Sequence, residues 1–470
     1  MKSVQSFPIE RVVSDGYCIG CGACAVVDDG LSMKLDRYGL FKPEGPFTRV
    51  AEANAVCPFS VTCNEDSIGM ELFGNDEGVD YDPHVGYYRG VFVGHVSLGK
   101  YRDRGGSSGF VTWLLAQLLN RGLIDGVIHL KPSFDAKDAL FEYAISSTVE
   151  EILAGAKSKY YPSHFDEVVR SIKGNGKRYA FVGVPCYIKA IKLLGKADEV
   201  LSSQIAYCIA LFCGHMKSVA YSEFIAGQLG IAPERIKAID FRVKDPTRPA
   251  NRYSVSVQGE HRGKVVTRTE SVSNLYGMDW GLGYFKPKAC DWCDDIVGEL
   301  ADVSSGDAWL PGYVKDPGGN NIVIVRSPEI HEIISSGIEH GELSFSNGTV
   351  EDVVLSQSGN YRHRREGLGI RIEAAERNKE WYPKKRTALL ESTGVTAARR
   401  KLYEQRSRMS GMSHDVFLKS GKNPLVFAVK MIPQEIYYYH LSGRLFKGVA
   451  KIIVGISRLL YRLVRYRVVS

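Results

Sequence analysis

The sequence predicts a mixed α/β (α+β or α/β) protein with a small N-terminal module, a central α/β domain and a helical C-terminal region. Five of its ten cysteines fall within the first 63 residues, which indicates a small cysteine-rich module. In the middle of the chain, apolar runs of strand length alternate with helical patterns. Beyond residue 365 the patterns are helical and charged. The expected units are residues 1–75, 76–365, 366–440 and 441–470.

The composition is that of a globular protein, since 44% of the 470 residues are hydrophobic. The N-terminus lacks the apolar stretch of a secretory signal, and no run of about 18 uncharged apolar residues occurs. We therefore expect a cytoplasmic protein. Its net charge of +7 equals the seven basic residues of 441–470, a segment without acids. The rest of the chain is neutral overall, so no nucleic-acid-binding surface is expected.

Three cysteines at three-residue spacing form the strongest motif, Cys18-Ile-Gly-Cys21-Gly-Ala-Cys24. The two glycines inside this run permit the unusual φ values that a tight loop around a cluster needs. The spacing matches the C-x2-C-x2-C run of bacterial ferredoxins, in which a C-P ligand completes a 4Fe–4S site. Here Cys57-Pro58 follows 33 residues after Cys24. The sequence therefore predicts a ferredoxin-like module that holds one 4Fe–4S cluster through these four cysteines.

A zinc site is the alternative, because four thiolates also suit tetrahedral zinc. Zinc sites usually come as two separated C-x2-C pairs, whereas three cysteines in succession favour an iron–sulfur cluster. Cys63 would belong to a second cluster in a two-cluster ferredoxin, but its usual partners are missing. We expect Cys63 to be a spare thiol.

A glycine- and serine-rich turn lies between a predicted strand, residues 91–96, and a predicted helix that starts at Phe110. Such a turn presents unpaired N–H groups and the positive end of a helix dipole to an anion, although helix packing alone also explains it. The basic and aromatic run at 157–162 suits contact with a flavin ring and its phosphates. The candidate cofactor-binding residues are Gly106, Ser107, Ser108, Gly109, Thr112, Lys157, Ser158, Lys159 and Tyr160.

Six ordered motifs between about residues 15 and 370 carry a family resemblance: GGSSGFVTWLL, KSKYYP, FVGVPC, FCGH, CDWC and ELADVSSGDAW. Together they resemble the coenzyme F420 hydrogenase/dehydrogenase beta-subunit family, and they are similar to bacterial members and to plant 7-hydroxymethyl chlorophyll a reductase. The resemblance implies an FAD enzyme whose 4Fe–4S clusters relay electrons to the flavin. One departure is Phe110, which stands where many relatives have a second glycine.

The same resemblance implies a second 4Fe–4S cluster held by Cys186, Cys213, Cys290 and Cys293. Only the last two have the local spacing of ligands, while the other two each follow an apolar strand next to Gly or Pro. For that pair, ordinary buried cysteine is the alternative. Cys208 lies inside an apolar run and is expected in the core.

Two polar segments leave their roles open. Asp302 and Asp307 alternate with small residues, and they either contact a ribityl chain or substrate or cap a turn. The run Arg362-His-Arg-Arg365 either binds an acidic substrate or forms a solvated face.

The last thirty residues predict a cationic amphipathic helix. Its basic residues recur at steps of three, four or seven: Arg444, Lys447, Lys451, Arg458, Arg462 and Arg465. Most other positions are apolar: Phe446, Val449, Ile452, Ile453, Ile456, Leu459, Leu460 and Leu463. This pattern is typical of a helix lying on an anionic membrane surface. The alternative is a helix docked on its own domain with arginines that reach out to water.

The preferred function is an oxidoreductase that passes electrons from ferredoxin or a similar donor through 4Fe–4S clusters to FAD and on to an organic substrate. One alternative is a non-catalytic electron-transfer beta subunit feeding a partner enzyme, for example in a cell-surface polysaccharide pathway. Another is a metal-stabilised binding protein without redox turnover. The residues do not identify the substrate.

Overall fold

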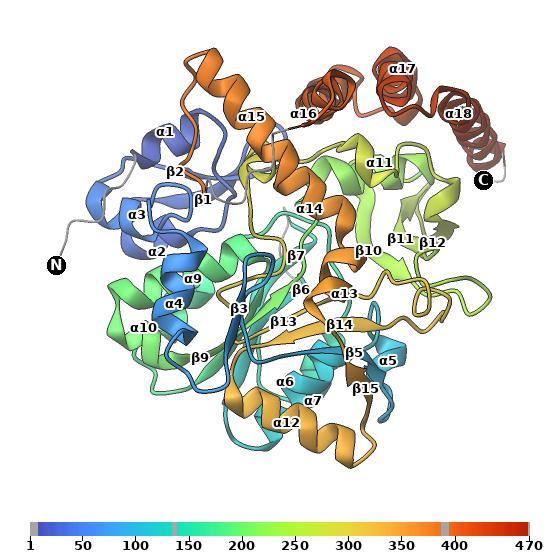
Figure 1. Ribbon diagram of the computed structural model, residues 1–470. Helices are drawn as coiled ribbons and strands as arrows, with labels where there is room; N and C mark the ends of the chain where they lie inside the picture. The colour runs from blue at the N-terminus through green and yellow to red at the C-terminus, as the bar shows by residue number, and fades with distance from the viewer. Residues whose placement is uncertain (1–7, 134–138, 387–393, 469–470) are drawn as a thin grey trace.

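The computed structural model describes residues 8–133, 139–386 and 394–468. It shows a mixed α/β architecture with an eight-stranded central sheet, an N-terminal module beside it and a layer of C-terminal helices (Figure 1). The predicted fold class is confirmed at this level, and the unit boundaries stay predictions.

The N-terminal module consists of short elements that carry the cysteine loops. They are α1 (Ile9–Ser14), α2 (Ala23–Val27), β1 (Ser32–Leu35), β2 (Phe41–Glu44), α3 (Val50–Val56) and α4 (Glu65–Phe73). β1 and β2 form an antiparallel hairpin, and a second short hairpin, β3 (Asp80–Asp82) with β4 (Gly86–Tyr88), leads into the central sheet. The module shares one apolar core with the central domain, in which Val12 and Tyr17 pack in the same cluster as Tyr187 and Trp292.

The central sheet has the strand order β15-β5-β14-β13-β9-β8-β6-β7. In this order the strands are Leu343–Asn347, Gly90–Val96, Asn321–Val325, Val303–Asp307, Ile205–Leu211, Tyr179–Gly183, Gly126–Pro132 and Phe141–Ser146. β13, β9, β8 and β6 pair in parallel, and the remaining pairs are antiparallel. The buried parallel strands are almost continuously apolar, as expected for strands covered on both faces.

Helices cover the central sheet. They are α5 (Tyr101–Arg104), α6 (Phe110–Asn120), α7 (Val149–Ala154), α8 (Asp166–Ile172), α9 (Pro185–Ala197), α10 (Glu199–Gln204), α11 (Val219–Gln228) and α12 (Pro328–Glu339). α6, α7 and α12 share one apolar cluster, which includes the fully buried Trp113, and α8, α9 and α10 share another. The predicted strand 91–96 and the predicted helix that starts at Phe110 are confirmed.

A second sheet was not predicted. It is antiparallel and consists of β10 (Ile236–Val243), β11 (Ser254–His261) and β12 (Lys264–Ser271). Arg262 and Gly263 join the last two strands, and both have positive φ, +51° and +75°, as in the tight hairpin turns that match strand twist. Short 3-10 turns occur at Pro233–Arg235, Val272–Asn274, Trp280–Leu282 and Lys288–Trp292.

The C-terminal region is helical, as predicted. It contains α13 (Val350–Ser356), α14 (Ser358–Arg364), α15 (Glu366–Arg377), α16 (Ala397–Lys419), α17 (Pro424–Leu441) and α18 (Leu445–Val468). α16, α17 and α18 lie side by side over α11 and the second sheet, with Phe427 and Leu459 fully buried between them and those elements (Figure 1). None of the helices in the described residues is both long and apolar enough to cross a bilayer.

Candidate functional site

The candidate site residues gather at one edge of the central sheet. β5, β13, β9 and β8 run in the same direction, so their carboxyl ends lie at the same edge. The glycine-rich turn follows β5, Asp307 ends β13, Cys213 follows β9, and Cys186 follows β8. Ligands in α/β proteins bind at this edge because loops and helix starts open there.

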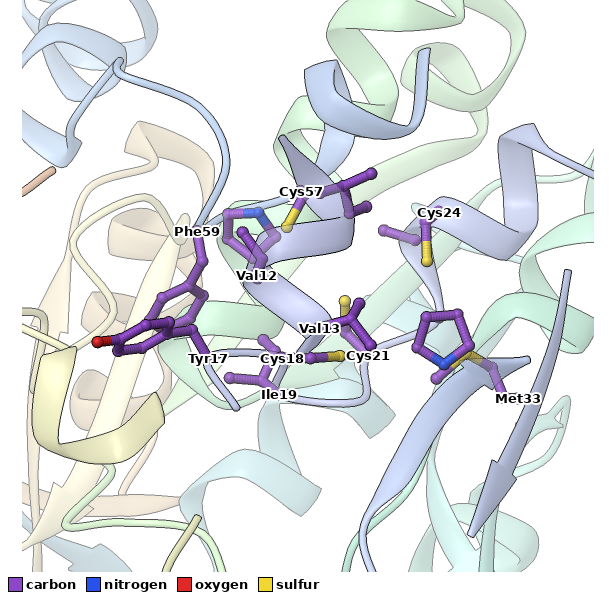
Figure 2. A pocket seen from close by; sticks show the side chains of 15 residues that line it. Val12, Val13, Tyr17, Cys18, Ile19, Cys21, Cys24, Met33, Cys57 and Phe59 are labelled. Atoms are coloured by element: carbon purple, nitrogen blue, oxygen red, sulfur yellow. The ribbon is translucent and has the colours of Figure 1, made fainter. Parts of the chain in front are cut away.

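The first cysteine group surrounds an apolar pocket in the N-terminal module. Cys18 and Cys21 come from the loop after α1, Cys24 from α2, and Cys57 from the end of α3. Figure 2 shows the four sulfur atoms turned toward a common space. The remaining pocket wall is apolar and includes Ile9, Val12, Ile19, Met33 and Phe59. The structure thus places the four thiols around one pocket, and their role as ligands of a cluster stays a prediction.

The glycines of the run are required by its geometry. Gly20 and Gly22 have φ values of +74° and +89°, which L side chains rarely adopt. A Cβ at Gly20 would lie 2.7 Å from the Phe41 carbonyl oxygen, and one at Gly22 would lie 2.6 Å from Asp166 Oδ1. The loop can therefore turn its sulfurs inward only with glycine at both positions.

The first group is largely buried, and backbone N–H groups donate hydrogen bonds to its sulfur atoms. Burial raises the pKa of the Cys57 thiol to about 12, and the amides of Phe59 and Ser60 oppose that rise by bonding to the sulfur. The Gly20 amide donates to Cys18 Sγ at 3.4 Å. Thiols this buried keep their protons unless a cation replaces them, so the pocket favours soft metal over free thiolate. The chemistry of these donors fits an iron–sulfur cluster.

The second cysteine group comes from three separate segments of the chain. Cys186 lies in the first turn of α9, Cys213 follows β9, and Cys290 and Cys293 belong to the 3-10 turn and its end. Burial raises the pKa of Cys290 and that of Cys293 to about 11. Charge on the other three thiols raises the pKa of Cys186 further above the effect of burial. The four thiols are therefore close enough to interact.

Arg364 faces this second group from α14. Its side chain is 1% exposed and donates to Cys293 Sγ at 2.7 Å and, more weakly, to Cys213 Sγ at 3.8 Å. It also donates to the carbonyl oxygens of Asp295 and Gly214, which fix its orientation. Burial works against its charge, but the four cysteines together raise its pKa above the ordinary range. Arg364 thus supplies a permanent positive charge beside the sulfurs.

The two cysteine groups are neighbours. Burial, and then charge on Cys186 and on Cys21, raises the pKa of Tyr143, so this tyrosine lies near a thiol of each group. Burial also raises the pKa of Tyr187, and the same two thiols add to that rise. The Tyr187 ring stacks on Tyr143 with centroids 6.1 Å apart, so an aromatic pair lies near both groups.

The glycine-rich turn and the basic run at 157–162 are brought together as the flavin prediction requires. A Cβ at Gly106 would lie 3.3 Å from Ser158 Oγ, and Gly106 lines a pocket with Lys244, Tyr253 and Gly319. Gly109 begins α6 with a φ of +85°. The hydroxyls of Ser107 and Ser108 are used internally, since they donate to the Asn320 carbonyl and to the Asn321 side chain.

The remaining candidate cofactor-binding residues make contacts within the protein around this site. Thr112 is buried in the first turn of α6. Lys157 pairs with Asp240, while Lys159 donates to the carbonyl oxygens of Ala156 and Lys157 at 2.8 and 3.0 Å. Burial lowers the pKa of Lys159 to about 7, because these carbonyls replace water without supplying a counter-charge. Tyr160 packs edge-on against Trp280, with centroids 5.1 Å apart.

Two cations of this pocket were missed in the sequence. Arg242 forms a two-pronged ion pair with Asp307, at 2.6 and 3.2 Å, and lies over the ring of Tyr253. Lys244 donates to the Ser107 carbonyl at 2.6 Å, and burial lowers its pKa to about 8. The sequence did contain a signal for them. Apolar and basic residues alternate in Phe-Arg-Val-Lys at 241–244, and in a strand this alternation places both cations on one face. A cluster of partly desolvated cations beside Gly106 fits the pyrophosphate of FAD.

Asp302 and Asp307, whose roles the sequence left open, have different surroundings. Asp302 accepts from the Cys208 amide at 2.7 Å and pairs with Lys192, which is a structural role, whereas Asp307 belongs to the cation pocket. Cys208 is 1% exposed and lies in the core, as predicted. Cys63 does not line the first pocket.

The run Arg362-His-Arg-Arg365 is not a solvated face, because Arg364 and Arg365 are buried. His363 Nε2 donates a hydrogen bond at 3.0 Å to the carboxylate of Asp291, a neighbour of Cys290, and only Arg362 is exposed. Across residues 8–133, 139–386 and 394–468, no three His, Cys, Asp or Glu side chains are placed to hold a single metal ion.

Comparison with known families gives two adjoining matches. Residues 91–170 match the coenzyme F420 hydrogenase/dehydrogenase beta subunit N-terminal region. Residues 176–351 match the C-terminal region of the same beta subunit. The two matches contain the glycine-rich turn, the run at 157–162 and the four cysteines of the second group.

Curated relatives include proteins of two sizes. The coenzyme F420-dependent sulfite reductase of Methanocaldococcus jannaschii is 24% identical over 70% of this chain, and the match spans 47% of that relative. The coenzyme F420 hydrogenase subunit beta of Methanothermobacter thermautotrophicus is also 24% identical, over 63% of this chain and 93% of its own length. This chain thus corresponds to about half of the first relative and to nearly all of the second.

Among solved structures, a chain of the F420-reducing NiFe hydrogenase complex from Methanosarcina barkeri aligns with a TM-score of 0.45 and 19% identity. The alignment covers 61% of this chain and 91% of that one.

Proposed function

This chain belongs to the coenzyme F420 hydrogenase/dehydrogenase beta-subunit family, and from that premise we propose that it is an iron–sulfur flavoprotein that transfers electrons between a one-electron donor and a two-electron organic substrate. The observation that carries the proposal is that three candidate sites lie close together. Two groups of four cysteines adjoin each other, and a glycine pocket with Lys244 in its wall lies at the same edge of the sheet. Bound clusters exchange single electrons, and a bound flavin converts single electrons into pairs.

The first group, Cys18, Cys21, Cys24 and Cys57, would hold a 4Fe–4S cluster near the N-terminal surface. Cys18 and Cys57 are partly exposed, so an external donor such as ferredoxin could approach this group. The apolar wall excludes water, and the amides that point at sulfur stabilise negative charge there.

The second group, Cys186, Cys213, Cys290 and Cys293, would hold the second cluster. Tyr143 and Tyr187 pack in the apolar cluster that also contacts Cys18, Cys57 and Cys186, so the two groups adjoin one core. Arg364 orients two of the sulfurs and offsets part of the negative charge that a cluster brings into a buried place.

The glycine pocket would bind FAD. Gly106 would let the backbone approach the pyrophosphate, and Lys244 in the pocket wall would offer positive charge to it. Lys159, whose pKa burial lowers to about 7, gains a counter-charge when an anion binds nearby. Tyr160 packs against Trp280, and Trp280 contacts His215, two residues after Cys213, so these rings would lie between the flavin and the second thiol group. The side of the pocket next to these rings suits the isoalloxazine ring.

A second candidate function is an electron-transfer beta subunit that feeds a partner enzyme. It is favoured by the relative of matching length, which is itself a hydrogenase subunit. The two candidates differ in whether the isolated chain turns over. A deazaflavin such as coenzyme F420 is the first substrate to test, because the relatives carry that coenzyme in their names.

The test is anaerobic stopped-flow reduction of the purified chain by reduced ferredoxin, followed at flavin wavelengths. The wild type should reduce its flavin within one turnover, and Cys21→Ser should slow that step while the flavin stays bound. Cys63→Ser is the matched control, because Cys63 does not line the pocket. Flavin reduction at an equal rate in all three proteins would contradict the relay. Continuous reduction of F420 by the isolated chain would favour the enzyme over the subunit.

A further inference from the structure

The two C-terminal helices expose an apolar surface that nothing in the described chain covers. Ten of the eighteen large hydrophobic side chains exposed in the described residues lie on α17 and α18. We call them the outer face: Val426, Val429, Ile436, Tyr437, Phe446, Ile453, Val454, Leu460, Tyr461 and Val464. Phe446 is 91% exposed and Tyr461 is 67% exposed. Single exposed apolar residues are common, but a concentration of this kind marks an interaction surface.

The outer face is continuous along both helices. Phe446, Ile453 and Leu460 recur every seven residues on α18, so they lie on one side of it. Val426, Val429 and Ile436 follow the three- and seven-residue steps of one side of α17. The helices pack against each other and are joined by a short turn, and they lie at the rim of the molecule (Figure 1). Their exposed stripes therefore form one surface.

The opposite side of α18 is firmly attached. Ile452 and Leu459 are buried in the core that α11 and the second sheet form. Arg462 is 4% exposed and donates to the Asn274 carbonyl at 3.0 Å, and Lys451 pairs with Asp279 at 2.9 Å. The outer face is thus not the loose side of a detached helix. The sequence predicted a single cationic stripe and a single apolar side for α18, and this was wrong. The apolar residues of α18 divide between an inward and an outward side, and Arg462 is buried. The side chain of Arg467 is outside the described residues.

The charge around the outer face has one sign. The exposed basic residues on α17, α18 and their connecting turn are Lys430, Arg444, Lys447, Lys451, Arg458 and Arg465. The only acid in residues 424–468 is Glu435, which is 2% exposed and faces inward. The surface of an ordinary protein partner carries both positive and negative charges. An anionic lipid surface carries only negative charge, so it matches this basic face better.

We infer that the outer face of α17 and α18 binds an anionic phospholipid bilayer, with its apolar side chains in the headgroup region and its cations against lipid phosphates. Tyr437 and Tyr461 suit this position, because aromatic rings with a polar tip favour the membrane interface. In this arrangement the two helices lie on the bilayer surface, and neither is long and apolar enough to cross the bilayer. The inference is independent of the proposed function, because none of the candidate cofactor ligands lies beyond residue 364.

The experiment is co-sedimentation of the full chain with vesicles of phosphatidylcholine alone and of phosphatidylcholine mixed with phosphatidylglycerol. The wild type should pellet with the anionic vesicles, remain in solution with the neutral ones, and be released by high salt. Phe446→Glu with Leu460→Glu should weaken pelleting at least tenfold. The matched control, Met70→Glu with Leu355→Glu, changes two exposed apolar residues elsewhere by the same charge and should pellet as the wild type does.

A second variant separates charge from folding. Lys430→Glu with Lys447→Glu leaves every apolar contact in place and should also weaken binding to anionic vesicles by at least tenfold. Bound flavin and iron are measured in all variants and should stay at the wild-type level, which distinguishes a lost surface from a lost fold. Failure of the wild type to pellet, or equal pelleting of face and control variants, overturns the inference. So does a wild-type dimer that the Phe446→Glu and Leu460→Glu changes convert to a monomer, because a second copy would then cover this face.

Discussion

Replacing Glu435 with glutamine should remove a pH dependence from the attachment of the C-terminal helices. Glu435 lies on the inner side of α17 and accepts a hydrogen bond from the Tyr284 hydroxyl at 2.5 Å. Burial raises the pKa of this carboxyl from 4.5 to about 7, and the hydrogen bonds from Tyr284 and Tyr276 oppose that rise only in part. In the folded chain the proton is therefore kept up to neutral pH.

The sign and the size of this pH dependence of stability follow from the difference between the folded and the unfolded pKa of Glu435. Between the unfolded and the folded pKa, the folded chain holds a proton that the unfolded chain has released, so stability falls as pH rises from 4.5 to about 7 and is level above that. A shift of about 2.5 units corresponds to about 3.4 kcal/mol in total, of which about 1.4 kcal/mol is lost between roughly pH 6 and 8.5. Glutamine cannot ionise, and its amide keeps the shape of the protonated acid.

Hydrogen exchange of the α17 amides measures this local opening directly. The ratio of protection factors, Glu435→Gln over wild type, should rise about tenfold from roughly pH 6 to 8.5, since 1.4 kcal/mol is one decade. Comparing the two proteins at the same pH cancels the intrinsic pH dependence of exchange. Glu404→Gln, at an exposed position of α16, is the control and should show a constant ratio. A constant ratio for Glu435→Gln as well would refute the reasoning.

Two further changes address the proposed cofactor sites. Arg364→Met removes a charge-assisted hydrogen bond worth about 2 kcal/mol, so the reduction potential of the second cluster should fall by roughly 90 mV in an EPR-monitored titration. Arg362→Met, at the exposed neighbour, should leave the potential unchanged, and equal potentials in the two variants would exclude this role of Arg364. Gly106→Val places a branched side chain where a Cβ already lies 3.3 Å from Ser158 Oγ, and it should weaken FAD binding at least tenfold, or by about 1.4 kcal/mol. Gly312→Val, where nothing lies within 4 Å, should bind FAD normally, and undiminished binding in Gly106→Val would remove the pocket from the account.

Local patterns predicted the parts of this molecule that local chemistry determines. The cysteine run required positive φ at its glycines, and the structure has +74° and +89° there. The helix from Phe110 and the strands around it follow from apolar periodicity. The hairpin of β11 and β12 was missed because its turn, Arg262-Gly263, lacks the usual Asn-Gly or Asp-Gly signal.

Long-range packing decided what the sequence left open. Arg364 looked like one member of a basic run, and only the contact of α14 with the turn that carries Cys293 makes it a partner of sulfur. In α18, Ile452 and Ile453 are equally apolar, yet the first is 5% exposed and the second 59%. Periodicity identifies the helix, but it cannot tell which of two apolar stripes meets the protein itself.

Iron and flavin content of the anaerobically purified chain tests the central claim most directly. If each group of four thiols holds one 4Fe–4S cluster, the wild type should contain about eight iron atoms and one FAD. Cys21→Ser and Cys290→Ser should each retain about four irons, because each removes a ligand of a different cluster. Stoichiometric zinc in place of iron would contradict the account. So would complete loss of iron in both variants, because the eight cysteines would then not form two independent cluster sites.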